Sequence, residues 1–308
     1  MPNLNYGYAT LLSSGNLYQF NLSDMSAGYT SDTYGGYLET MTSDSAHVYA
    51  GGQTIYKVFQ YNPYDMSKIA ESLNLGGTVR ILCCDNDYVF ASASGKIFKL
   101  DPSDMSTIAE SSTLMTIIYG MSVKGDYVYA GGSSQTVIKC SISDLSTSLT
   151  SPDYGGYVMD VLATDNYIYA SGQTTQTVCK YDPADMSEVA ESADYGGLPS
   201  GLAFTNGYIF AGGATIQKVY KYDPSDMSKL TESATYGGNI SGVGSDDDYV
   251  YAGGTTTQKV FKYDPFDLSK ISETSSFGVN ITALNIQSAV YYVLTATFDT
   301  DHITIAWT

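Results

Sequence analysis

Basic residues and histidines are scarce in this chain of 308 residues. Lys and Arg together number 14 against 32 Asp and Glu, and Arg80 is the only arginine. Phosphate binding needs clusters of basic side chains, so this imbalance argues against nucleic acid as a partner. His47 and His302 are the only histidines, which is too few for a histidine-based metal site. His47 also stands where other copies of the repeat described below carry tyrosine, which favours a structural role.

Long hydrophobic runs are missing as well. No apolar stretch approaches the ~20 residues that a membrane helix needs, so no insertion into a membrane is predicted. The first five residues contain neither the basic segment nor the apolar segment of a secretory signal. Localisation is therefore left open between a cytoplasmic protein and a virion or extracellular protein that is exposed after lysis.

Cysteine is limited to four positions, whose spacing matches neither a disulfide framework nor a metal site. Cys140 and Cys179 fall where other repeats carry tyrosine or phenylalanine. A free cysteine can act as a small hydrophobic residue in a core. Both are therefore predicted to be core side chains, and no disulfide is predicted.

What the chain has in abundance is an internal repeat of 39 to 41 residues. A strand motif of the form Tyr-Val-Tyr-Ala-Gly-Gly recurs along it. An Asp-(Met/Leu)-Ser turn keeps the same spacing, starting at Asp24, Asp65, Asp104, Asp144, Asp185, Asp226 and Asp267. Repeats of this length with short strands are typical of a β-propeller, in which each repeat forms one blade of four antiparallel strands. The sequence thus predicts an all-β propeller of about 41 residues per repeat, as a single domain over residues 1–308.

The number of blades follows less directly from the sequence, because the expected strands do not divide evenly into blades. The chain begins at a second strand and ends at a third strand, at residues 303–307. A ring of seven blades requires the last inner strand to complete the first blade and leaves one hairpin over. A ring of eight would leave the first and last blades incomplete. The seven complete turn motifs favour seven blades, with eight as the alternative.

Two columns of aromatic residues follow the repeat. The first lies in the second strand and comprises Tyr8, Tyr49, Phe90, Tyr129, Tyr169, Phe210, Tyr251 and Tyr292. Tyrosine and phenylalanine interchange there and alanine follows in most copies, which predicts core packing between neighbouring sheets. The second column ends the fourth strand and comprises Tyr34, Tyr154, Tyr195, Tyr236 and Phe277, with Leu75 and Leu114 in the remaining copies.

The second column has two interpretations. Leucine in two copies favours packing. The alternative is a set of exposed rings on the same face as the Gly/Thr/Gln hairpins, a mixture suited to a sugar or an extended peptide. The ligand-binding hypothesis therefore names Tyr154, Tyr195, Tyr236 and Tyr34.

One position of the inner strands varies from copy to copy and carries Glu39, Arg80, Tyr119, Met159, Ser200, Ser241 and Thr282. Because Glu39 and Arg80 belong to neighbouring blades, an ion pair between them is favoured, with an anion or polar ligand at the channel mouth as the alternative. The acidic turns lie on the other face. Asp246, Asp247 and Asp248 form their only triple and the best of the weak candidates for calcium, although turn capping explains most such residues.

The repeat also resembles a known architecture. Its strand motif, followed by Lys-Val-Phe-Lys-Tyr-Asp-Pro and Asp-Met-Ser-Lys-Leu, resembles YVTN-type and quinoprotein-like propeller repeats over essentially the whole chain. Quinoproteins hold pyrroloquinoline quinone through tryptophans, acids and calcium, and this chain has one tryptophan, Trp307. No cofactor is therefore predicted. The resemblance implies a surface or secreted binding protein without known catalysis.

Catalytic groups are few. Glu39 and Asp160 are the only carboxylates on the inner strands, and their columns differ by one position, so they should point to opposite faces. The leading hypothesis is a non-catalytic binding module that recognises a glycan or protein partner. A virion or a cell surface is the setting considered for it. A cytoplasmic scaffold that docks peptides, and a propeller hydrolase or lyase acting on carbohydrate, are the alternatives. The oligomeric state is left open.

Overall fold

The computed structural model describes residues 5–11, 15–287, 294–299 and 302–307, with side chains described only as far as residue 287. Short strands and tight turns make up this part of the chain. It contains no helix, hence none long and apolar enough to cross a membrane. The all-β prediction is confirmed.

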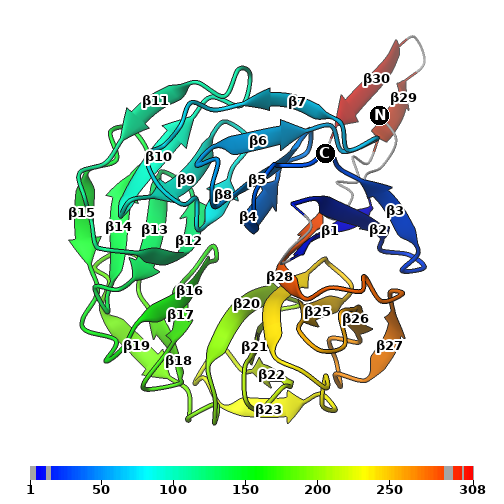
Figure 1. Cartoon of the computed structure of the whole chain (residues 1–308). Coiled ribbons are helices and arrows are strands. Elements are labelled where there is room, and N and C mark those ends of the chain that lie inside the picture. Colours follow the sequence, from blue (N-terminus) through cyan, green and yellow to red (C-terminus); the bar gives the residue numbers. More distant parts are fainter. Residues whose placement is uncertain (1–4, 12–14, 288–293, 300–301, 308) are drawn as a thin grey trace.

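Seven sheets of four antiparallel strands surround a central axis (Figure 1). Blade 1 is the sheet β28-β1-β2-β3, and blades 2 to 7 follow in chain order from β4–β7 to β24–β27. The inner strands are β4 (Leu38–Ser43), β8 (Leu82–Cys84), β12 (Ile118–Lys124), β16 (Val158–Ala163), β20 (Pro199–Thr205), β24 (Ile240–Ser245) and β28 (Ile281–Gln287). The second strands are β1 (Tyr6–Leu11), β5 (Val48–Gly52), β9 (Val89–Ala93), β13 (Tyr127–Gly132), β17 (Ile168–Gly172), β21 (Tyr208–Gly213) and β25 (Val250–Gly254).

The outer half of each blade is more uniform. Its third strands are β2 (Leu17–Asn21), β6 (Val58–Tyr61), β10 (Lys96–Leu100), β14 (Val137–Ser141), β18 (Val178–Tyr181), β22 (Val219–Tyr222) and β26 (Val260–Tyr263). The outer strands are β3 (Ala27–Thr30), β7 (Lys68–Glu71), β11 (Thr107–Glu110), β15 (Thr147–Thr150), β19 (Glu188–Glu191), β23 (Lys229–Glu232) and β27 (Lys270–Glu273). Five of these edge strands carry Lys or Glu, and such charges discourage pairing with another sheet.

Blade 1 is assembled from two distant parts of the chain. Its inner strand β28 pairs with β1, and the Thr10 and Thr282 hydroxyls lie 2.8 Å apart across this pair. The prediction of seven blades, with the last inner strand completing the first blade, is confirmed. The additional hairpin consists of β29 (Leu294–Asp299) and β30 (His302–Trp307), which pair with each other. The single domain over residues 1–308 stays a prediction.

The core lies between neighbouring blades, where the face of one sheet packs against the next. Tyr49 of β5 is fully buried in a cluster with Val79, Leu82 and Ala91 of blade 3. The first aromatic column is confirmed as core for its seven described members, whose exposed fractions are 0 to 3%. Its eighth member, Tyr292, lies outside the described residues.

Two further kinds of residue fill this core. Cys140 and Cys179 are buried free thiols, as predicted. The Met or Leu of the turn motif, which the repeat indicated only as a turn residue, is also buried in every blade. Met186 is an example, with a φ of 61° and no exposed surface. A left-handed backbone is unfavourable for methionine, so burial of its side chain between blades has to offset that strain.

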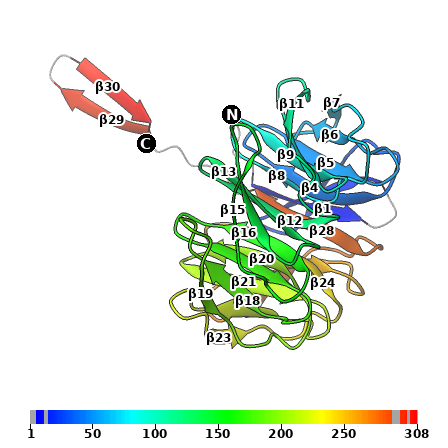
Figure 2. The ribbon, with the colours of Figure 1, turned by 90° about the vertical axis from the view of Figure 1, so that its left-hand side faces the viewer.

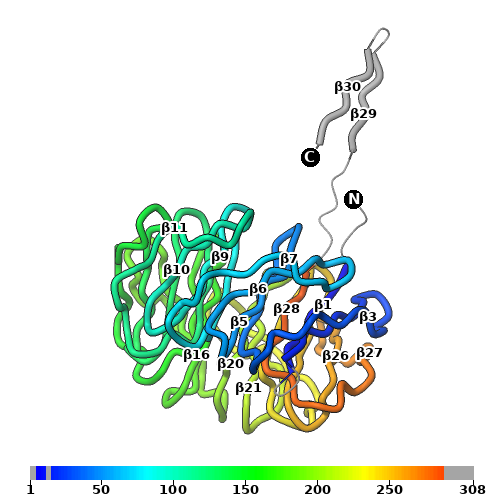
Figure 3. The backbone as a smooth tube through the Cα atoms, turned by 45° about the horizontal axis from the view of Figure 1, so that its top comes forward, coloured from blue at the N-terminus to red at the C-terminus, as the bar shows by residue number. Residues whose placement is uncertain are grey.

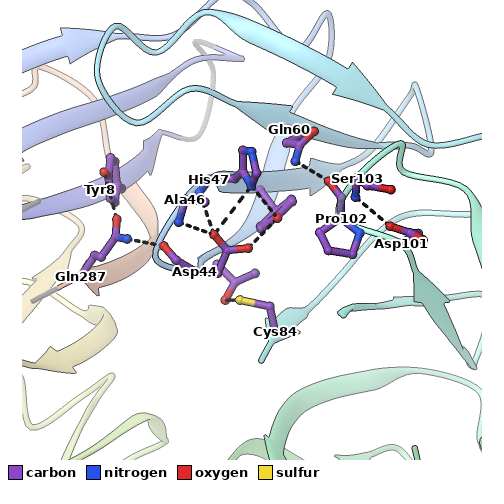
Figure 4. Close-up of polar contacts among 12 residues, drawn as sticks. Tyr8, Asp44, Ala46, His47, Gln60, Cys84, Asp101, Pro102, Ser103 and Gln287 are labelled. Carbon is purple, nitrogen blue, oxygen red and sulfur yellow. Dashed lines mark hydrogen bonds and ion pairs between the residues drawn. The ribbon is translucent and has the colours of Figure 1, made fainter. Parts of the chain in front are cut away.

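A buried polar side chain of the third strand fastens each blade to the next. In blades 3 to 7 it is a lysine. The Lys180 ammonium lies 3.6 Å from the centre of the Tyr167 ring and donates to the Pro224 carbonyl of blade 6 at 2.7 Å. In blade 2 the neutral Gln60 donates to the Pro102 carbonyl at 2.8 Å (Figure 4). In this blade His47 stands in place of the tyrosine that contacts the lysine in other blades, and Gln60 carries no charge for an aromatic ring to stabilise.

Candidate functional site

The two faces of the ring differ in chemistry because antiparallel strands send alternate connections to opposite faces. The acidic-turn face carries the turns between inner and second strands and between third and outer strands. The hairpin face carries the hairpins between second and third strands and the crossovers to the next blade. Figures 2 and 3 show these connections along the two faces of the ring.

Carboxylates on the acidic-turn face cap their own turns. One oxygen of Asp246 accepts from the Asp248 and Tyr249 backbone N–H groups at 2.9 and 2.6 Å, and the other accepts from the Tyr251 hydroxyl at 2.7 Å. Asp44 makes the same contacts in blade 2 (Figure 4). Among the described residues no group of three potential ligands could hold a metal ion. The calcium candidate at Asp246, Asp247 and Asp248 therefore has no converging carboxylates to support it.

The turn motif uses its aspartate in the same way. Asp185 Oδ1 accepts from the Ser187 backbone N–H at 2.9 Å. This hydrogen bond, with the Ser187 hydroxyl, holds the pKa of Asp185 below its usual value. Equivalent bonds recur in the other blades. The acidity of this face is thus turn chemistry repeated around the ring.

The crossover tyrosines do not form an exposed surface, which corrects the ligand-binding hypothesis. Tyr34, Tyr154, Tyr195 and Tyr236 expose only 1 to 3% of their surface. Each hydroxyl donates to a backbone carbonyl at the end of the next blade's hairpin. The distance is 2.7 Å from Tyr154 to Thr177 and 2.6 Å from Tyr236 to Lys259. With both faces of the ring buried, no sugar can stack on these residues.

The glycines after these tyrosines show why the rings are buried. Gly155 has a φ of 87°, which turns the chain. A Cβ on Gly156 would lie 2.2 Å from the Gln173 carbonyl oxygen and 2.7 Å from the Thr174 Cβ. The crossover therefore docks directly against the hairpin of the next blade, and the tyrosine is drawn in beneath it.

Another set of side chains on the hairpin face stays accessible. Six of the seven inner strands contain a β-bulge near their start, seen as a register shift, for example between Val158 and Asp160. The six bulged residues, together with Arg80 at the matched position before β8, are called here the axial ring. They are Glu39, Arg80, Tyr119, Met159, Ser200, Ser241 and Thr282, and all seven are half-buried. Bulges often re-aim side chains beside functional sites. The variable column of the sequence therefore becomes a ring of seven side chains around the axis.

Members of the axial ring make different contacts. Glu39 accepts a hydrogen bond from Gln53 in the hairpin of its own blade. The Tyr119 ring stacks on the Tyr157 ring of blade 5, with centroids 6.1 Å apart and an angle of 30° between planes. Tyr157 is 41% exposed. This aromatic pair is accessible in a way that the crossover tyrosines are not.

The favoured Glu39–Arg80 ion pair is not formed, so this prediction is wrong. Glu39 pairs with Gln53, and Arg80 has no carboxylate partner among the described residues. The reason lies in the hairpins. Blade 2 connects its strands through residues 53–57, which supply Gln53, whereas blade 3 connects β9 to β10 through residues 94–95 alone. Blade 3 therefore has no counterpart of Gln53 beside Arg80.

A small cavity of about 160 Å³ lies beside Arg80. Thr78 and Arg80 lie on one side, with residues 92–95 of blade 3 and residues 116–118 of blade 4 around the rest. The sequence did carry a signal for it. A Ser94-Gly95 dipeptide replaces the longer Gly/Thr/Gln hairpin in this one copy, and such pairs form two-residue hairpin turns.

Asp160 is the one described inner-strand carboxylate with a perturbed pKa. Burial raises the pKa of Asp160 to about 7. One of its oxygens accepts from the Leu202 backbone N–H of blade 6 at 2.7 Å, and the other accepts from the Val161 N–H at 2.9 Å. In blade 2 the Thr40 hydroxyl accepts from the Leu82 N–H in the same way. Asp160 thus joins two inner strands.

Comparison with known proteins identifies the architecture. No protein-family model and no curated protein sequence matches this chain. The crystal structure of the WD40 β-propeller domain of Doa1 superposes with a TM-score of 0.70, covering 81% of this chain and 86% of that chain at 11% identity. The fold is a seven-bladed β-propeller. The computationally designed Ika8 protein is also similar, with a TM-score of 0.68, 12% identity, and coverage of 80% of this chain and 77% of that chain.

These identities are low enough that the likeness shows the fold alone. The narrower resemblance to YVTN-type or quinoprotein-like repeats is not established by it. A propeller supports a binding or interaction module in general, because the rigid ring presents its variable connections at two faces. What it binds must be argued from the site.

Proposed function

We propose that this chain is a non-catalytic binding module that recognises a glycan or protein partner on its hairpin face, with the axial ring at the centre. The observation that carries the proposal is the contrast between the two faces. The Asp-(Met/Leu)-Ser turns of the acidic-turn face repeat almost unchanged, because they close hairpins. The axial ring combines acidic, basic, aromatic, apolar and hydroxyl side chains at one matched position, which is what recognition of an asymmetric ligand requires.

Backbone strain recurs in the hairpins of this face. Thr54, Thr174, Thr215 and Thr256 have φ between 69° and 76°. A β-branched residue rarely adopts this conformation, and each such residue costs about 1–3 kcal/mol. The surrounding structure holds this strain in place, as it does for the Met or Leu of the turns on the other face. The hairpins around the axial ring therefore have a fixed shape.

The stacked pair of Tyr119 and Tyr157 is the contact we favour within that face. An aromatic ring offers an apolar surface to the C–H side of a sugar or to a peptide side chain, and its hydroxyl can donate a hydrogen bond. Tyr157 is exposed enough to do both. It takes the role that the buried crossover tyrosines cannot fill.

The remaining parts of the proposal concern the setting of the protein and the absence of catalysis. A virion or cell-surface setting is supported by the richness in Tyr, Thr, Ser and Gly and the scarcity of Arg and Glu. A cytoplasmic scaffold that docks peptides is the alternative, and the same face would serve it. The absence of catalysis is supported by the two inner-strand carboxylates, because Glu39 bonds to Gln53 and both oxygens of Asp160 accept backbone N–H groups.

The test compares two tyrosines of equal exposure on opposite faces. Tyr157 on the hairpin face and Tyr64 on the acidic-turn face are each 41% exposed. Wild type, Tyr157→Ser and Tyr64→Ser would be applied to a glycan array and to an immobilised peptide library. We expect Tyr157→Ser to lose at least about tenfold in affinity, as for a central aromatic contact, and Tyr64→Ser to bind normally. A loss of binding confined to Tyr64→Ser would place the binding site on the acidic-turn face and contradict the proposal.

A further inference from the structure

Departures from the repeat are concentrated around blade 3. The crossovers that enter and leave this blade carry Leu75 and Leu114 in place of the usual tyrosine, and Met115-Thr116 replaces the Gly-Gly pair after Leu114. Blade 3 also has the shortest hairpin, at residues 94–95, and the shortest inner strand, β8. A repeat that is regular elsewhere has thus been altered in several independent places that meet in one region.

The only arginine of the chain lies in that region. Arg80 borders the cavity of about 160 Å³, and its guanidinium has no carboxylate partner among the described residues. The residues around the cavity contain no Asp or Glu, in a chain that has 32 of them. A positive charge in a half-buried position without a counter-ion attracts an anion.

Hydroxyl groups complete the lining. Thr78, Ser92, Ser94 and Thr116 border the cavity together with Arg80. The Ser92 hydroxyl accepts from the Ile81 backbone N–H at 3.2 Å, and the Ser94 hydroxyl donates to the Gly76 carbonyl at 3.0 Å. Both oxygens are therefore held in place and still have capacity for a further hydrogen bond.

The shape and chemistry of this cavity restrict the ligand. Its volume is below the roughly 300 Å³ of ordinary small-molecule pockets, so it admits one end of a ligand and not the whole. A guanidinium binds a carboxylate through two parallel hydrogen bonds. Hydroxyl side chains both donate and accept, which suits the hydroxyls of a sugar, because each of these also donates and accepts.

We propose that the Arg80 cavity binds the carboxylate of an acidic sugar, such as a uronic acid at the end of a glycan. This inference rests on the proposed binding function and deepens it, because it names the chemical class of the ligand and the side chain that recognises its charge. The neighbouring pair of Tyr119 and Tyr157 would then contact the next sugar of the same glycan. A peptide with a free terminal carboxylate is the competing ligand.

The experiment uses the fact that one arginine gives one Nε–H signal in a two-dimensional NMR spectrum. The full chain, labelled with nitrogen-15, would be titrated with sodium glucuronate, methyl glucoside, sodium acetate, and acetyl-glycyl-glycine with a free or an amidated end. We expect the Arg80 signal to shift saturably with glucuronate and not with methyl glucoside. Acetate and the free peptide should bind at least about tenfold more weakly, because they lack the hydroxyl contacts.

Variants test the same site by affinity. Arg80→Lys keeps the charge but loses the paired geometry, and Lys124→Gln removes a positive charge on the acidic-turn face, where Lys124 pairs with Asp165. We expect Arg80→Lys to lose at least about tenfold in affinity for glucuronate-ended glycans on the array, and Lys124→Gln to bind as wild type. Circular dichroism confirms folding of both.

Several outcomes would overturn the inference. They are an unmoved Arg80 signal, equal shifts with acetate, tighter binding of the free peptide, or equal losses in both variants. Binding of neutral glycans that depends on Tyr157 but not on Arg80 would leave the proposed function standing and remove only this inference. A glucuronate shift at Arg80 without any Tyr157-dependent binding would support this inference and remove only the role proposed for the Tyr119–Tyr157 pair.

Discussion

At the residue scale, the hydroxyl of the crossover tyrosine has become a structural group. Four blades use it to reach a carbonyl of the next blade, and the ring is buried around it. Blade 7 has Phe277 at this position, and blades 2 and 3 have leucine. The ring can therefore be replaced, and the hydrogen bond contributes stability without deciding the fold.

We expect Tyr236→Phe to lower the free energy of unfolding by about 0.5–1.5 kcal/mol, because the 2.6 Å bond to the Lys259 carbonyl is lost. Urea unfolding followed by circular dichroism measures this. Tyr157→Phe, which removes a hydroxyl from an exposed ring, is the control and should change stability by less than about 0.5 kcal/mol. Equal stability of Tyr236→Phe and wild type would show that the bond contributes nothing.

Asp160 offers a prediction about pH. An ordinary aspartate loses its proton near a pKa of 3.8, whereas burial raises the pKa of Asp160 to about 7. Between these values the folded state holds more protons than the unfolded state, so this group lowers stability as pH rises through that window. Above pH 7 its effect is constant. Asp160→Thr removes the titration and can keep the bond between blades, as Thr40 does with Leu82.

We therefore expect Asp160→Thr to gain stability relative to wild type as pH rises from 4 to 8, by about 1 kcal/mol or more. Urea unfolding at both pH values measures the difference. A difference that stays constant over this range would mean that Asp160 titrates alike in the folded and unfolded chain. A falling difference would mean that the folded state favours the ionised carboxylate.

At the element scale, the third strand joins each blade to the next through one buried polar side chain. Lysine serves in five blades and glutamine in two, and all donate to a carbonyl in the turn of the following blade. Burial lowers the pKa of Lys180, and the Tyr167 ring compensates part of its lost hydration. The contact between blades therefore requires a hydrogen-bond donor more than it requires a positive charge.

Two substitutions of Lys180 test this contact between blades 5 and 6. Lys180→Met leaves the Pro224 carbonyl without its donor and should lower stability by about 1–3 kcal/mol. Lys180→Gln reproduces the hydrogen bond that Gln60 makes in blade 2, so it should lower stability clearly less. Thermal and urea unfolding distinguish the two. If glutamine and methionine are equally destabilising, the ammonium charge itself is essential.

At the scale of the whole molecule, the ring is closed by a strand from late in the chain. Without β28, blade 1 would leave the edge of β1 unpaired, and Gln287 could not bridge the Tyr8 hydroxyl and the Asp44 carbonyl (Figure 4). Closure removes edges that would otherwise pair with other chains. The stability of the ring should therefore depend sharply on where the chain is cut.

We expect a chain ending at Gln287 to unfold cooperatively at nearly the temperature of the full chain. A chain ending at Val279 lacks β28 and should lose at least about 10 °C or its cooperative transition. Differential scanning calorimetry measures both, and size-exclusion chromatography detects aggregation of the shorter chain. A destabilised chain ending at Gln287 would show that the later residues belong to the same domain.

Much of this architecture could be predicted from the sequence, because the repeat spacing, the core column and the count of strands are local or periodic properties. Tyr49 and Phe90 needed only alternation and repetition to be recognised as core. The site was less predictable. The sequence left Tyr154 open between packing and exposure and favoured an ion pair for Arg80. In the structure a crossover under the next hairpin buries Tyr154, and a shortened hairpin leaves Arg80 beside a cavity.

The sequence by itself determined the all-β ring and the two faces, since these follow from hydrophobic alternation and turn residues along one strand after another. It favoured seven blades over eight, and the pairing of β28 with β1 decided between them. Only the tertiary structure decided which polar and aromatic side chains meet across blades. Glu39 and Arg80 are neighbours in the repeat, but Gln53 binds the first and leaves the second beside a cavity. Such contacts depend on distances between different repeats, which no periodicity within the chain encodes.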